Sequence, residues 1–278
     1  MADNDVSEMS KENLPPYAFK LHLVDTRTSL VKAWDKEISK IPSVNLTDPT
    51  QGFKVETHNT TFQDFFTKGV FQCVVSPANS FGLMDGGLDY YISEYYGGFE
   101  ALVPIVQKEI QDKWCGEQNV GTCLIVDVNE LSSSIKKYKH LNAPRYIAHC
   151  PTMRTPKSLD QSDDIVYRCT WAMLTAVRYH NAIVKSEGKN SKHQRIDEIV
   201  CAGFGTGVGG FSEDRCAAQM ALAIKNFTAA PANSNQKVTR TEGIGNGSLS
   251  WGSGLLIHWS YARKIERAVQ TLFHTDAE

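Results

Sequence analysis

Residues 201–211, with the sequence CAGFGTGVGGF, carry five glycines within eight positions. Glycine adopts positive φ angles and has no Cβ atom, so a ligand can approach the backbone of such a loop closely. The residues before the loop have the pattern of a buried strand, and those after it recur at helical spacing: Cys216, Met220, Ile224 and Phe227. Inward-facing N–H groups beside a helix N-terminus attract negative charge. The loop is therefore predicted to bind an anion, rather than to be a turn that merely requires glycine.

The same loop satisfies the GxGxxG pattern of dinucleotide-binding enzymes through Gly205, Gly207 and Gly210. That fold also needs an acidic residue about 20 positions later, at the end of a second parallel strand. Here those positions read AAPANSNQ, and only 68 residues follow Gly210. No Gly-Lys-Ser/Thr follows the loop, which excludes a P-loop. The phosphate of a nicotinamide cofactor or a nucleoside triphosphate is thus not the expected ligand.

A second candidate for chemistry is the segment HCPTMRT at residues 149–155, which has the composition of a cysteine phosphatase loop. Those enzymes have five residues between the cysteine and the arginine, which lets the arginine fold back over the phosphate. Here three residues separate Cys150 from Arg154. Covalent catalysis by a Cys150 thiolate is therefore not predicted.

The elements that must position these residues alternate between strand and helix. The apolar patterns predict strands at 19–24, 53–57, 71–76, 122–128, 146–150, 196–202 and 255–259. They predict helices near 30–38, 87–97, 103–114, 163–185, 216–227 and 265–272, with Thr28 or Ser29 capping the first, Tyr91 on the apolar stripe of the second and Pro104 in the first turn of the third. Such alternation indicates an α/β sheet that is covered on both faces, with its sites at the carboxyl ends of the strands.

Composition narrows the class of protein further. Of the 278 residues 41% are hydrophobic, and a net charge of −2 provides no general attraction for nucleic acid or acidic membranes. Seven cysteines without a CxxC pair argue against a disulfide framework and a structural zinc site, and favour a reducing compartment. We expect a disordered tail at residues 1–16, a single domain over 17–278 with a flexible insertion at about 228–254, and a cytoplasmic or nuclear location.

Three strand ends together resemble the macro domain, an ADP-ribose-binding family: CVVSPANSFGLMDGG, YIAHCPTMRTP and VCAGFGTGVGGF. The resemblance covers about residues 18–227. It implies a three-layer α-β-α fold around a central mixed, mostly parallel sheet. The stretches LHLVDTRTSLVKAW and YIAHCPTMRTP are similar to a fungal branch proposed to be ADP-ribose 1″-phosphate phosphatases. Two positions depart from the usual family motif: Ser76 replaces its first asparagine, and Asp85 the first glycine of its triplet.

The resemblance implies a set of site residues. Asn79 would contact ribose hydroxyls, and the family's adenine-contacting aspartate aligns near Asn59, with Asp25 and Glu56 as rivals. Asn79, Asp89 and His149 match positions implicated in phosphatase activity, with His149 as a candidate general acid. Asp89 falls in the first turn of a helix, where the macrodipole alone would also favour a carboxylate. The full set of ligand contacts implied is Asp25, Asn59, Ser76, Ala78, Asn79, Gly86, Gly87, Gly203, Gly205, Thr206, Gly207, Val208, Gly209 and Phe211.

The activity implied is hydrolysis of ADP-ribose 1″-phosphate, a nucleotide by-product of RNA processing, to ADP-ribose and phosphate. The alternatives are a non-catalytic reader of ADP-ribose or ADP-ribosylated proteins, and a hydrolase that removes ADP-ribose from a protein side chain or acyl ester. The sequence contains no evident cluster of metal ligands, so we expect metal-independent chemistry without a cofactor. No direct nucleic-acid or membrane partner is expected.

Overall fold

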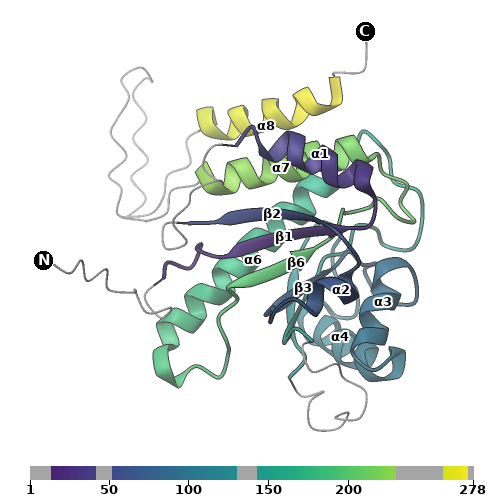
Figure 1. The fold of residues 1–278 in the computed structure, drawn as a ribbon, viewed down its shortest axis with the longest axis vertical. Coiled ribbons are helices and arrows are strands. Elements are labelled where there is room, and N and C mark those ends of the chain that lie inside the picture. The colour runs from purple at the N-terminus through teal and green to yellow at the C-terminus, as the bar shows by residue number, and fades with distance from the viewer. Residues whose placement is uncertain (1–13, 42–51, 130–142, 230–258, 275–278) are drawn as a thin grey trace, which may run out of the picture.

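The computed structural model describes residues 14–41, 52–129, 143–229 and 259–274. Its centre is a six-stranded sheet with the order β2-β1-β6-β3-β5-β4 (Figure 1). All neighbouring strands are parallel except β4, which is antiparallel to β5. This confirms the predicted mixed, mostly parallel sheet. The strands are β1 (Lys20–Asp25), β2 (Lys54–Asn59), β3 (Cys73–Ser76), β4 (Leu124–Asp127), β5 (Tyr146–His149) and β6 (Glu198–Cys201).

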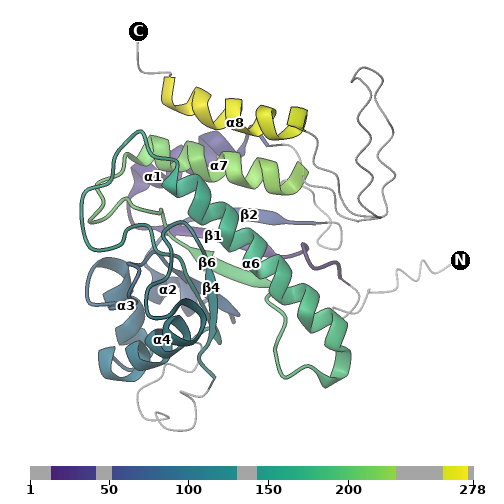
Figure 2. The same cartoon turned by 180° about the vertical axis from the view of Figure 1, so that it is seen from behind.

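Helices cover both faces of the sheet and complete the predicted three layers (Figures 1 and 2). One face carries α1 (Thr28–Ile38), α6 (Ile165–Glu187) and α7 (Glu213–Ala229), and α8 (Trp259–His274) packs on the outside of α7. The other face carries α2 (Phe62–Phe66), α3 (Gly87–Tyr95) and α4 (Phe99–Trp114). A short 3-10 helix, η4 (Gly188–Asn190), follows α6.

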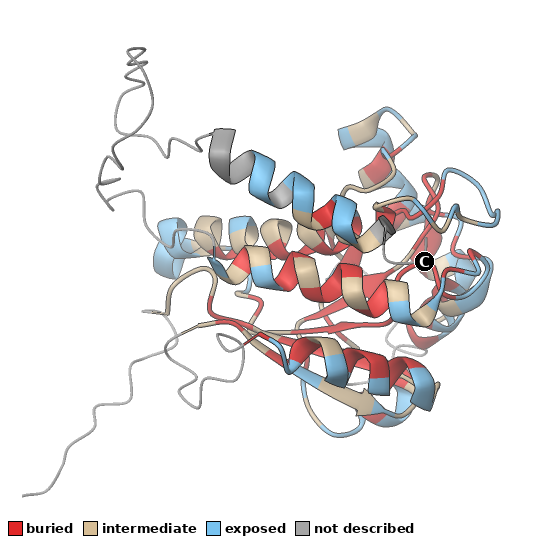
Figure 3. Ribbon diagram, turned by 90° about the horizontal axis from the view of Figure 1, so that it is seen from above, coloured by how far each residue is buried: buried red, intermediate tan, exposed pale blue. Residues whose placement is uncertain are grey.

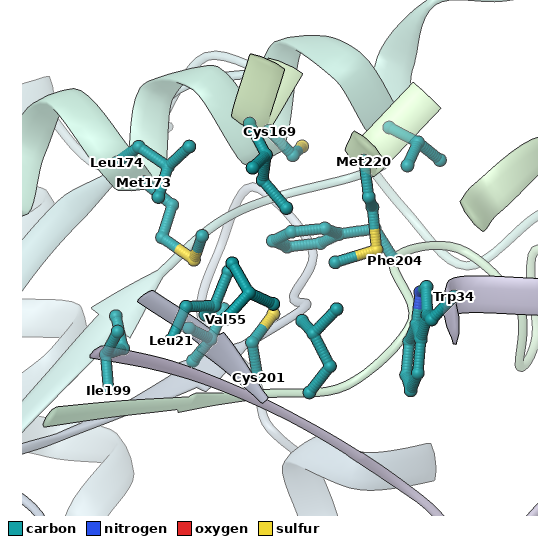
Figure 4. Close-up of a cluster of buried hydrophobic side chains, with 14 of the residues drawn as sticks. Leu21, Trp34, Val55, Cys169, Met173, Leu174, Ile199, Cys201, Phe204 and Met220 are labelled. Atoms are coloured by element: carbon teal, nitrogen blue, oxygen red, sulfur yellow. The ribbon is translucent and has the colours of Figure 1, made fainter. Parts of the chain in front are cut away.

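The central strands β3, β5 and β6 are mostly apolar because both of their faces are buried, whereas edge strand β2 is largely polar. In β1, Leu21 and Leu23 point into the core beneath α1, α6 and α7, whereas Val24 points into the core on the α2 side. Figure 4 shows the first of these cores, where Phe204 from the loop after β6 packs with Trp34 and Met220. The helices show the complementary pattern in Figure 3, with buried stripes toward the sheet and exposed outer faces.

Several local expectations were wrong. The N-cap of α1 is Arg27, without a side-chain hydrogen bond; Thr28 is the first helical residue, and its hydroxyl donates to Asn59. α4 begins at Phe99, so Pro104 lies inside the helix and not in its first turn. The last residues of the predicted tail are held in place, since the Pro15 and Pro16 carbonyl oxygens accept hydrogen bonds from other parts of the chain.

Other expectations fall largely on residues outside the described ranges. These are the tail up to residue 13, the insertion from residue 230 onward and the strand at 255–258; Trp259, its last predicted residue, begins α8. Within the described residues, no helix combines the length and the apolar character that crossing a membrane requires.

Candidate functional site

A cleft of about 600 Å³ lies at the carboxyl ends of the parallel strands. Its lining comes from the segments that follow β1, β2, β3, β5 and β6, so five separate connections converge on one space. This is where the alternation of strands and helices predicts a site. The segments that contribute are 25–27, 60–63, 77–79, 85–91, 152–156 and 202–209.

The glycine loop forms one wall of the cleft with its backbone. Its ends are closed by hydrogen bonds from Gly210 N–H to the Gly207 carbonyl (2.9 Å) and from Phe211 N–H to the Gly205 carbonyl (3.0 Å). Among the described residues, no acceptor is bonded to the backbone N–H groups of residues 205–209. The loop therefore offers consecutive donors just before α7, an arrangement that binds anions.

An arginine that the sequence interpretation missed ties this loop to the end of β1. Arg27 donates two hydrogen bonds to Thr206, one to its carbonyl oxygen (3.1 Å) and one to its hydroxyl (2.6 Å). The same guanidinium donates to both carboxylate oxygens of Asp25, at 3.0 and 2.9 Å. The Asp25 carboxylate raises the pKa of Arg27, so the clamp stays charged. In the sequence, this arginine could be recognised by an Asp-x-Arg pattern at the end of a predicted strand.

The loop after β3 forms the opposite wall. Asn79 is buried, and its Oδ1 accepts a hydrogen bond from the Phe81 N–H. Its Nδ2 has no hydrogen-bond partner within the described part of the chain, and the residue lines the cleft. The chain then passes through Gly86 and Gly87, where Gly87 takes a φ of 59°, and enters α3. An amide donor and a helix N-terminus are thus available at this wall.

Asp89, at the cleft wall that follows β3, has a strongly shifted pKa. It lies in the first turn of α3, lines the cleft and is buried. Burial raises its pKa to about 7, against the opposing effect of the Ser76 hydroxyl, which donates to Oδ1 at 2.6 Å. Near neutral pH the carboxyl group is therefore present in both protonation states, which suits a group that moves a proton.

Ser76, predicted as a ligand contact, lies behind the cleft lining in this structure. It is fully buried behind Asp89 and does not line the cleft. Its hydroxyl orients the Asp89 carboxyl group instead.

His149 is also not where a general acid is needed. It is fully buried, it does not line the cleft, and its Nε2 lies beneath the loop after β3, close to Gly82. Its Nδ1 lies 2.6 Å from Oε1 of Gln118. Burial lowers the pKa of His149 to about 3, so the imidazole is neutral at pH 7. The structure therefore places this side chain toward the helical layer and not in the cleft lining, where the predicted acid would act.

Three further predicted contacts lie outside the cleft. The Asn59 amide donates to the carbonyl oxygens of Asp25 and Thr26 and accepts from Thr28, so it braces the ends of β1 and β2. Glu56 faces Lys20 and two histidines on the α2 side of the sheet. Phe211 packs in the core below the glycine loop. Of the three adenine candidates, Asp25 alone lines the cleft.

The remaining predicted residues do meet at the cleft. They are Asp25, Ala78, Asn79, Gly86, Gly87, Asp89, Gly203, Gly205, Thr206, Gly207, Val208 and Gly209. Sequence reasoning missed the apolar end formed by Phe62, Leu88 and Tyr91. Tyr91 belongs to the predicted apolar stripe of α3, yet it is 57% exposed at the cleft and not part of the core.

Comparison with known families identifies the family to which this protein belongs. A family model described as a macro-like domain matches residues 65–238, more than half of the chain. The protein belongs to the macro-like domain family. Within this macro-like domain, the matched residues include the loop after β3, the segment after β5 and the glycine loop after β6.

Among solved structures, this macro-like domain is similar to the Oceanobacillus iheyensis macrodomain with ADP, at 22% identity and a TM-score of 0.42, over 59% of this chain and 72% of that chain. An asparagine-to-alanine mutant of that macrodomain matches at 21% identity and a TM-score of 0.41, over 58% and 69%. A glycine-to-valine mutant with ADPR matches at 15% identity and a TM-score of 0.31, over 58% and 88%.

Proposed function

We propose that this macro-like domain binds ADP-ribose in its cleft and hydrolyses ADP-ribose 1″-phosphate to ADP-ribose and inorganic phosphate. The observation that carries the proposal is the pairing of two walls. Residues 205–209, whose backbone N–H groups have no acceptor in the described part of the chain, line the same cleft as Asp89, a buried carboxyl group with a pKa of about 7. One wall suits a diphosphate, and the other suits proton transfer.

In the proposed complex the diphosphate accepts hydrogen bonds from the glycine-loop amides. The free Nδ2 of Asn79 donates to ribose hydroxyls. Asp25 accepts from the adenine amino group, because a carboxylate has about four acceptor positions and Arg27 occupies only some of them. The resemblance of LHLVDTRTSLVKAW and YIAHCPTMRTP to the fungal phosphatase branch supports the phosphorylated substrate over other ADP-ribose derivatives.

The proposed reaction is attack of water on the 1″-phosphorus. The water oxygen forms a bond to phosphorus, the bond from phosphorus to the ribose oxygen breaks, and that oxygen takes a proton from solvent water. Ionised Asp89 acts as the general base and takes a proton from the attacking water. General base catalysis of this kind raises the rate by about 10²–10⁴-fold. Donors on the two walls stabilise the charge of the phosphoryl group in the transition state.

Seven free cysteines fit the further proposal of a cytoplasmic or nuclear location.

The second candidate is a reader that binds ADP-ribose without turnover. The specific observation in its favour is that His149, the general acid implied by the resemblance, lies outside the cleft and is neutral at pH 7. A reader requires only the two binding walls.

Calorimetry with ADP-ribose and a phosphate-release assay with ADP-ribose 1″-phosphate separate these functions. Binding with phosphate release that Asp89→Ala abolishes is the result expected for the phosphatase. Binding without release supports the reader, and release of ADP-ribose from a modified protein or acyl ester supports the third alternative. Failure to bind ADP-ribose would contradict all three.

We predict that His149→Ala destabilises the fold and leaves the chemistry intact. The substitution empties a fully buried position and leaves Oε1 of buried Gln118 without its partner, which lowers the free energy of unfolding by about 2–4 kcal/mol. Urea denaturation measures this loss, and kcat for phosphate release is expected to change by less than about threefold. A loss of about 100-fold in kcat with ADP-ribose affinity retained would restore the role of general acid to His149.

Arg27→Lys is predicted to weaken ADP-ribose binding by about tenfold. Lysine cannot donate to Asp25 and Thr206 in the fork geometry of a guanidinium, so the glycine loop loses its tie to β1. Calorimetry measures the affinity. Arg178→Lys on α6, outside the cleft lining, is the matched control and should bind normally. Equal affinity in both variants would show that the clamp does not hold the loop.

A further inference from the structure

Two neighbouring strands bring a histidine pair and a carboxylate together on the α2 side of the sheet, away from the cleft lining. Alternate residues of a strand share a face, and in the β1–β2 register His22 lies opposite Glu56, with His58 two residues further along. The His22 Nδ1 atom lies 3.0 Å from Nε2 of His58. The Glu56 Oε2 atom lies 3.6 Å from the former nitrogen and 3.9 Å from the latter.

These three separations match those between ligands of one metal ion. A point equidistant from the three atoms lies about 2.1 Å from each, which is the length of Zn²⁺–N and Zn²⁺–O bonds. The 3.0 Å between the two imidazole nitrogens is also the length of a hydrogen bond. Oε2 of Glu56, in contrast, lies beyond hydrogen-bond distance from both nitrogens, so the hydrogen bond between the histidines does not account for its position beside them.

The second nitrogen of His22 has the partner that a metal-binding imidazole requires. Its Nε2 lies 3.2 Å from Oε2 of Glu198, on the neighbouring strand β6. A carboxylate at this position holds the proton on Nε2, so the lone pair of Nδ1 points toward Glu56 and His58. The rings of Phe65 and Phe71 pack against His22 at centroid distances of 5.2 and 5.3 Å and fix its orientation.

The donor set and its access define the class of ion. Two imidazoles and one carboxylate suit Zn²⁺ and related first-row divalent ions, and they leave one position of a tetrahedral site for water. His22 is 4% exposed, but the side chains of His58 and Glu56 on edge strand β2 are 26% and 45% exposed, which gives an ion a route from solvent. The other carboxylate oxygen of Glu56, Oε1, forms an ion pair with Lys20 at 3.2 Å, which restrains the orientation of the carboxylate.

We propose that His22, Glu56 and His58 form a binding site for a divalent transition-metal ion, Zn²⁺ above all, with Glu198 orienting His22. The ion would cross-link β1 and β2, and Asp25 at the end of β1 and Thr60 just after β2 line the cleft. The sequence prediction of no metal cluster missed it because the histidines are 36 positions apart and belong to no short motif. The site does not depend on the proposed phosphatase or reader function.

Titration calorimetry of the full chain with ZnCl₂, after treatment with a chelator and its removal, tests the site. We expect one bound Zn²⁺ whose affinity falls at least tenfold in His58→Gln and in Glu56→Gln, both partly exposed positions that should tolerate substitution. Glu198→Gln should weaken binding by about 10- to 100-fold through loss of the orienting carboxylate. His193→Gln is the matched control, because this exposed histidine also faces a carboxylate, Asp127 at 3.8 Å, outside the cluster.

Far-UV circular dichroism of each variant confirms its folding, and Co²⁺ as a spectroscopic probe identifies the donor atoms. Visible bands of a tetrahedral site without a thiolate charge-transfer band would support the nitrogen and oxygen ligands. Absence of stoichiometric Zn²⁺ binding, wild-type affinity in folded His58→Gln and Glu56→Gln, or a thiolate band would each overturn the proposal.

Discussion

Gly209→Ala is expected to lower the affinity for ADP-ribose by about 100-fold or more, which corresponds to about 2.7 kcal/mol. A Cβ atom at residue 209 would lie 2.5 Å from the Gly205 carbonyl oxygen and 2.8 Å from Cδ1 of Leu159. The nearest clash is with backbone, so no side-chain rotation relieves it. The loop must open, which separates the N–H groups of the residues that line the cleft.

Gly207→Ala is the matched control for this substitution. It adds the same methyl group to the same loop, but a Cβ atom there meets no other atom within 4 Å, and φ lies outside the left-handed region. Its thermal stability should equal that of the wild type, and its affinity should change by less than about threefold, whereas Gly209→Ala should also lower the melting temperature.

Calorimetry with ADP-ribose and thermal denaturation on both variants measure these effects. Wild-type affinity in Gly209→Ala would show that the loop amides do not bind the diphosphate. If Gly207→Ala alone lost binding without a change in melting temperature, the added methyl group would block the approach of the ligand to the loop, and crowding within the loop would not be the cause.

The glycine loop was predictable from the sequence because its evidence is local. Strand residues, five glycines and helical spacing follow one another within about 30 positions, and each has one dominant structural meaning. Asn79 and Asp89, which the family resemblance indicated, also lie at the cleft. The alternation of elements likewise predicted the layers correctly, because each apolar pattern in the described chain needs a partner to bury it.

The errors concern side-chain direction and long-range partners. At the end of β5, His149 and Cys150 point to opposite faces of the sheet, and the packed helices bury both side chains outside the cleft lining. The role of Arg27 depends on Thr206, a residue 179 positions away. No local pattern contains either fact.

Asp89→Asn is expected to abolish turnover and, at the same time, to stabilise the fold. Asparagine keeps an oxygen that can accept from the Ser76 hydroxyl, but it cannot take a proton from water, so phosphate release should fall by about 10²–10⁴-fold. ADP-ribose affinity should persist, because the glycine loop and Asn79 are unchanged. Retained turnover would remove Asp89 from the proposed mechanism.

The stability change follows from the raised pKa of Asp89. Burial brings the folded-state pKa to about 7, against 3.8 for the ordinary group. Between these values the unfolded chain has lost a proton that the folded chain retains, so wild-type stability decreases as the pH rises from about 4 to about 7. Asparagine does not titrate and avoids this decrease.

The advantage of Asp89→Asn should therefore be absent below about pH 4, grow through the acidic range, and level off above pH 7 at about 2–4 kcal/mol. Urea denaturation of both proteins between pH 4 and 8 measures it, with Asp85→Asn, an exposed carboxylate at the same cleft, as the control that should show little change. A constant difference across this range would mean that Asp89 is not held in a buried, partly protonated state. Inactivation together with stabilisation would indicate that this carboxyl group is retained for its chemistry at the expense of the fold.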